Sequence, residues 1–98
     1  MIVGACHVRL HLPESHSLKD KRQVIKSVLA RVRGNFEVAA AEVDDQDVWQ
    51  VATLGIACVS NDAGHVEDIL THAARYIEES RPDVEITEVQ IDVQRVLE

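Results

Sequence analysis

The chain has 98 residues, the length of one domain, with 46% apolar and 28% charged residues. Its formal net charge of −7 argues against indiscriminate binding to nucleic acid or to an anionic membrane. No apolar run is long enough to cross a bilayer and no signal peptide is recognisable, so we expect a cytoplasmic protein without membrane contact. Cys6 and Cys58 lie in apolar stretches, and we expect both to be reduced core residues.

The first two predicted elements are a strand and a helix. Residues 2–12 alternate between an apolar and a mixed set of side chains, which predicts a half-buried strand that ends at Pro13. Ser17 and Asp20 have the spacing of a capping box and predict a helix start. The apolar positions that follow recur with a helical period as far as Gly34, which predicts the end of the helix.

Two further strands are predicted in the middle of the chain. Residues 36–43 are rich in alanine and form the second strand. Residues 44–48 are mostly polar and predict a turn. Residues 49–60 contain a continuous apolar stretch, which places the third strand centrally in the sheet.

The last two predicted elements are again a helix and a strand. The second helix begins at Asn61 or Asp62 and ends before Pro82. Residues 84–96 predict the last strand. Its alternation changes phase near Thr87, which predicts a β-bulge.

The predicted order βαββαβ is that of a single ferredoxin-like α+β domain spanning residues 1–98. It implies a four-stranded antiparallel sheet, order 4-1-3-2, with both helices on one face. The open face would hold His7, Arg9 and His11 among small residues, without the aromatic residues that stack bases in RNA-recognition motifs. Such a surface suits a second copy, so we expect a homodimer through the sheet or its edge.

The first predicted helix concentrates positive charge. From Ser17 to Arg33 there are six basic residues and one acid. At 100° per residue, four of the basic residues form one stripe beside the apolar face: Lys19, Arg22, Lys26 and Arg33. Such a stripe is usually solvated surface, but beside the free N–H groups of a helix N-terminus it can also bind phosphate or carboxylate. Lys21 differs, because it projects to the apolar side and needs a partner or a route to solvent.

Known metal and nucleophile motifs are absent. Asp44, Asp45 and Asp47 lack the spacing of an EF-hand, and the histidine pairs are too far apart to share one ion. No nucleophile elbow, P-loop or dinucleotide fingerprint is present. We therefore expect no metal site, cofactor or catalytic residue. Trp49 is expected to pack against the sheet edge rather than to stack on a ligand.

Three motifs in order resemble the YlxP-like family, catalogued as domain of unknown function 503. They are the stretches 12–22, 41–50 and 59–62. The resemblance implies a small bacterial cytoplasmic protein with a ferredoxin-like fold, encoded near genes for translation and ribosome maturation. It implies no activity and no catalytic residues. The polar positions that match the family are Ser17, Lys19, Asp20, Lys21, Arg22, Glu42, Asp47, Trp49, Gln50, Asn61 and Asp62.

Three functions remain open from the sequence. The first is a non-enzymatic accessory protein that binds RNA or a ribosomal assembly through the basic helix. The second is a regulatory module that binds a phosphate- or carboxylate-bearing small molecule at the helix N-terminus. The third is an enzyme that uses Lys21 with Asp47 or Glu42 as an acid–base pair. For the first two, the predicted binding residues are Ser17, Lys19, Lys21, Arg22, Lys26, Trp49 and Gln50.

Overall fold

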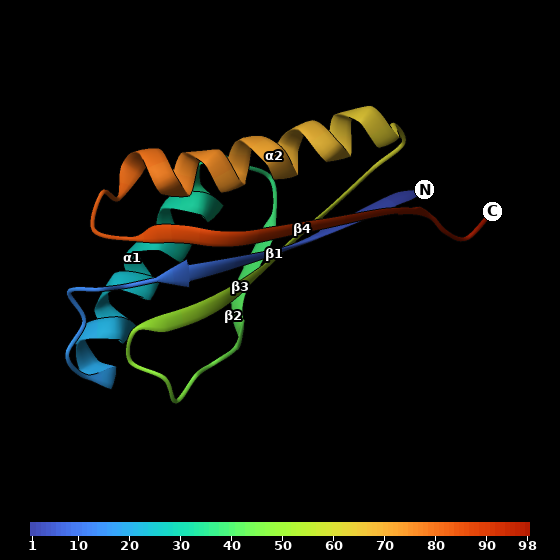
Figure 1. Ribbon diagram of the computed structural model, residues 1–98. Helices are drawn as coiled ribbons and strands as arrows, with labels where there is room; N and C mark the ends of the chain where they lie inside the picture. Colours follow the sequence, from blue (N-terminus) through green and yellow to red (C-terminus); the bar gives the residue numbers. More distant parts are fainter.

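The computed structural model describes residues 1–98 and has the predicted order of elements. The sheet has four strands, and Figure 1 shows both helices on one face of it. The six elements are β1 (Ile2–His11), α1 (Leu18–Asn35), β2 (Ala39–Asp44), β3 (Val51–Ser60), α2 (Ala63–Ser80) and β4 (Glu85–Arg95). Neither helix is both long enough and apolar enough to span a bilayer.

The sheet confirms the predicted topology. Its strand order is β2-β3-β1-β4, which is 4-1-3-2 read from the other edge, and all three pairings are antiparallel. Along β1 the even-numbered residues are buried against the helices, because side chains alternate between the two faces of a strand. The helices add their own apolar faces, with Ile25 and Val32 from α1 and Leu70 and Ile77 from α2. One core of 19 buried residues results.

The predicted β-bulge in β4 is also confirmed. Arg9 pairs with Glu88 and Leu10 pairs with Ile86, so Thr87 is the extra residue on the β4 side. The Thr87 hydroxyl donates to the carbonyl of Arg9 at 3.3 Å. The bulge lets Ile86 and the valines further along β4 face the same side of the sheet.

Some predicted boundaries were wrong by a few residues. Residues 36–38 lie outside β2, because Phe36 follows α1 and packs edge-on against Tyr76 at 5.6 Å between ring centroids. Gly34 lies within the last turn of α1 rather than after it, and no glycine has a positive φ. Residues 49–50 belong to the loop before β3.

Candidate functional site beside helix α1

The N-terminus of α1 is capped by the chain itself. The Ser17 hydroxyl accepts the N–H of Asp20 at 3.0 Å. The Asp20 carboxylate in turn accepts the N–H of His16 at 3.1 Å. This reciprocal arrangement fills part of the N-terminal hydrogen-bonding capacity and places a negative charge at the positive end of the helix dipole. The structure therefore gives Ser17 a capping role.

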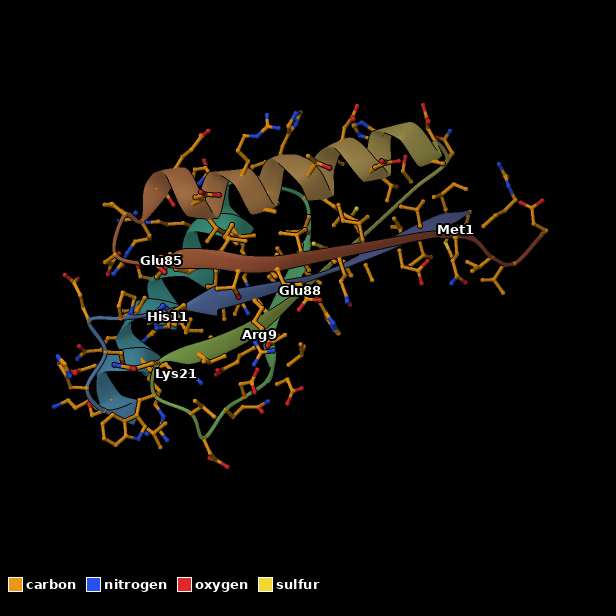
Figure 2. The ribbon with its side chains drawn as sticks, in the orientation of Figure 1. Met1, Arg9, His11, Lys21, Glu85 and Glu88 are labelled. Carbon is orange, nitrogen blue, oxygen red and sulfur yellow. The ribbon has the colours of Figure 1, made fainter.

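Lys21 is buried between α1 and the β2–β3 hairpin, where Figure 2 labels it. Only 2% of its side chain is exposed, and Nζ lies 2.9 Å from Oε2 of Glu42. The Lys21–Glu42 contact is an ion pair without hydrogen-bond geometry, so Oε2 has no hydrogen bond of its own. The ammonium also donates to the carbonyl of Asp45, a residue held at a φ of 61°. Lys21 thus has partners inside the protein and lies away from the surface cations with which the sequence grouped it.

Gln50 joins the hairpin loop to the loop that precedes α1. Its side-chain amide donates to the carbonyls of Pro13 and Ser15, at 3.3 and 3.0 Å. Its own carbonyl accepts the N–H of Leu12 at 2.8 Å. These contacts hold the 45–50 loop beside the start of α1.

Lys19, Arg22 and Lys26 are exposed on α1 and take part in none of the five ion pairs. Arg33, the fourth residue of the stripe, donates to the carbonyl of Ala40 in β2. That bond places the stripe on the side of α1 that faces β2. The α1 side that faces α2 differs, because there Arg31 donates to the carbonyl of Ser80 at 3.1 Å.

Trp49 lies on the 45–50 loop and is 53% exposed, so the expectation that it packs against the sheet edge is wrong. Its neighbour Val48 is 44% exposed. The strand pairing stops at Val51, and the hydrogen bonds of Gln50 turn this part of the loop toward the start of α1. Trp49 therefore precedes the residue that binds the segment just before the helix that carries the free cations. The sequence missed this exposure because an aromatic residue next to an apolar strand is usually packed.

The open face of the sheet holds His7, Arg9 and His11, as the alternation of β1 predicted. A shallow hollow over this face is lined by polar side chains of both charge signs: His7, Arg9, Asp44, Asp45, Thr53, Glu88 and Gln90. Figure 2 shows Arg9 near Glu88 and His11 near Glu85, and His11 Nδ1 lies 3.2 Å from Glu85 Oε2. Because acids and bases are mixed here, this face has less net attraction for an anion than the free cations of α1.

The fold and the side chains described above define a small ferredoxin-like α+β domain with unpaired cations along its first helix. The model of the family described as "Protein of unknown function (DUF503)" matches residues 3–91, and the chain belongs to this family. It is 35% identical to the "Uncharacterized protein YlxP" of Bacillus subtilis (strain 168) over 86 residues, which cover 88% of this chain and 92% of the relative. A de novo designed protein with ferredoxin fold, solved by solution NMR, has a TM-score of 0.58 at 14% identity. That alignment covers 96% of this chain and 84% of the designed one, and it supports the fold alone.

Proposed function

We propose that the protein is a non-enzymatic cytoplasmic accessory factor that binds RNA, free or within a ribosomal assembly. The binding surface would consist of Lys19, Arg22, Lys26 and Trp49, which we call the α1–Trp49 surface. The proposal is supported by three exposed cations without ion-pair partners, together with a half-exposed indole on the loop that Gln50 joins to the segment before α1.

Each part of this surface suits a different part of an RNA chain. Lysine and arginine side chains neutralise phosphates, which supplies most of the affinity for nucleic acid. An exposed indole can stack on an unpaired base, a contact worth about 1–3 kcal/mol. The net charge of −7 limits the interaction to this surface and predicts a modest affinity that falls steeply with salt.

The alternative small-molecule site at the N-terminus of α1 has less support. An anion bound there would be repelled by the carboxylate of Asp20, which accepts the N–H of His16. The acid–base pair of Lys21 and Glu42 is likewise less well supported, because the Lys21 side chain is only 2% exposed and its ammonium already contacts Glu42 and the carbonyl of Asp45. RNA binding uses only side chains that are exposed.

The chain offers an internal probe for the test, because Trp49 is its single tryptophan. Indole fluorescence is followed while an unstructured or a hairpin RNA is added at about 50 and 200 mM salt. The test variant is Lys19→Gln/Arg22→Gln/Lys26→Gln. The matched control is Arg9→Gln/Arg75→Gln/Arg95→Gln, which changes the net charge equally on other parts of the fold.

Fluorescence quenching that saturates, weakens tenfold or more at the higher salt and is lost in the test variant alone would support the proposal. Three phosphate contacts correspond to a slope of about −2 in a plot of log affinity against log salt for a single strand. Equal losses in both triple variants would show a general charge effect and overturn the assignment of the surface. Absence of quenching at low salt would overturn RNA binding at the α1–Trp49 surface.

We also propose that the chain forms a homodimer. Three regions can meet a second copy: the open sheet face and the free edges of β2 and β4. All three expose apolar residues, with Val59 on the face, Val43 in β2, and Val89 and Ile91 in β4.

A further inference from the structure

The free edge of β4 exposes apolar side chains that the helices leave partly uncovered. Val89 and Ile91 are 41% and 38% exposed, although they pair with the buried Val8 and Cys6 and so face the helix side. In Figure 1, β4 is the outermost strand and runs beside α2 along nearly its whole length. The strand is 11 residues long and contains no proline or lysine, the residues that commonly protect an edge from pairing.

The main-chain groups of this edge are free at definite positions. The N–H of Val96 donates to the carbonyl of Met1 at 2.9 Å, so Val96 directs its main-chain groups toward β1. Because these groups alternate along an antiparallel ladder, Val89, Ile91 and Val93 direct theirs away from the sheet. The residues with free main-chain groups are therefore also the residues whose side chains form the apolar row of β4.

We propose that a second copy of this chain pairs with the β4 edge, strand to strand and antiparallel, with the two-fold axis at Ile91. This inference deepens the proposed homodimer by assigning its surface and register. Ile91 lies opposite the partner's Ile91, and Val89 lies opposite the partner's Val93. Val89, Ile91 and Val93 each form a hydrogen-bonded pair with a residue of the partner strand, and these three pairs supply about six main-chain hydrogen bonds. The joined sheet has eight strands, and the apolar rows of the two β4 strands cover one another.

Side-chain charge favours this register over the two adjacent ones, which have their axes at Gln90 and at Asp92. On the open face, Gln90 then lies opposite the partner's Asp92, and Glu88 opposite the partner's Gln94. Amide and carboxylate side chains already associate along this face, since Gln90 donates to Glu88 at 2.7 Å and Gln94 to Asp92 at 3.0 Å. An axis at Gln90 would instead place Glu88 opposite the partner's Asp92, and an axis at Asp92 would oppose two aspartates. Like charges directly opposite one another destabilise a strand pair.

Cross-linking tests the register. In the proposed dimer, the Cα atoms of the two Ile91 residues are about 5.5 Å apart, within the range of a disulfide. Ile91→Cys is therefore expected to give a covalent dimer on mild oxidation, whereas Gln90→Cys is not. The native thiols interfere little, since both are buried and burial raises the pKa of Cys6 to about 11. Cross-linking through Gln90→Cys alone, or of both variants equally, would overturn the register.

Sedimentation of a second pair of variants tests the surface. Ile91→Lys places two cations at the axis and is expected to convert a dimer to a monomer, with the circular dichroism of the fold unchanged. Val59→Lys, at a more exposed apolar site on the open face, is the matched control and should remain dimeric. If Val59→Lys loses the dimer and Ile91→Lys keeps it, the assignment of the interface to the β4 edge is overturned, whereas the homodimer itself stands. A monomeric wild-type chain at about 100 μM would overturn both the β4 interface and the homodimer, without bearing on RNA binding.

Discussion

Nζ of Lys21 lies 2.9 Å from Oε2 of Glu42, and only 2% of the lysine side chain is exposed. The pair joins α1 to β2, while the same ammonium binds the carbonyl of Asp45 in the hairpin loop. A buried charge that loses its partner is costly, because neither water nor protein compensates for it. The pair therefore fixes how the hairpin loop sits against the helix that carries the proposed RNA-binding surface.

Lys21→Met is expected to destabilise the fold by about 2–4 kcal/mol, because it leaves the carboxylate of Glu42 without its ion-pair partner. The double variant Lys21→Met/Glu42→Met should recover at least half of that loss, since an apolar pair of similar size can replace a buried ion pair. Urea unfolding of the wild type, the two single variants Lys21→Met and Glu42→Met, and the double variant measures the coupling free energy between the two side chains. Lys26→Met, at an exposed position of the same helix, is the control and should change stability by less than about 0.5 kcal/mol. Additive effects of the two substitutions would contradict a coupled pair.

The fold was predictable from local patterns, and the site was predictable only in part. Alternation in β1, the cap at Ser17 and the phase change at Thr87 are properties of neighbouring residues, and the structure confirms all three. The burial of Lys21 depends on its contacts with Glu42 and Asp45, which are more than twenty residues away along the chain. The sequence indicated that Lys21 needed a partner, but the identity of that partner is set by the packing of α1 on β2.

Replacing Gly4 and replacing Gly34 by alanine are predicted to change the stability of the fold in opposite directions. A Cβ atom on Gly4 would lie 2.2 Å from Cγ1 of Val66 and 2.9 Å from Cδ1 of Leu70, both in the buried core. Gly4→Ala should therefore force α2 away from β1 and cost about 1–3 kcal/mol. Gly34→Ala meets nothing within 4 Å and lies in a helix, so it should stabilise the chain by about 0.5–1 kcal/mol. Thermal unfolding of both variants checks the pair, and a shift of the same sign in both would contradict the packing of Gly4.

The two cysteines are predicted to be unreactive in the folded chain. Both are buried, and burial raises the pKa of Cys6 to about 11 and the pKa of Cys58 above its usual value. At pH 7.5, where thiols of ordinary pKa are partly ionised, a disulfide reagent should react much more slowly with the folded chain than with the chain in denaturant. Two thiols per chain should react promptly after unfolding. A prompt reaction of either thiol in the folded protein would indicate that the β1–β3 region opens.

The turn between α2 and β4 is predicted to lose stability in acid. Arg81 binds the carboxylate of Asp83 through two hydrogen bonds, Nε to Oδ1 at 2.8 Å and Nη2 to Oδ2 at 2.5 Å. The hydrogen bond from Arg81 is the main cause that lowers the pKa of Asp83, whereas burial opposes the shift. Since the pKa is lower in the folded than in the unfolded chain, the stabilisation is complete above the unfolded pKa of about 4 and is lost as the pH falls toward the folded value.

Asp83→Asn should therefore cost about 1 kcal/mol at pH 7, a modest value because both side chains are partly exposed. The difference from wild type should shrink below about pH 4, as the wild-type carboxylate takes up its proton. Thermal unfolding from pH 3 to pH 7 measures both trends, and Asp68→Asn, at an exposed position of α2 that takes part in no ion pair, is the control. A pH-independent difference would mean that the substitution acts through the shape of the turn, for which the N–H of Val84 and the carbonyl of Arg81 supply a separate bond at 3.2 Å.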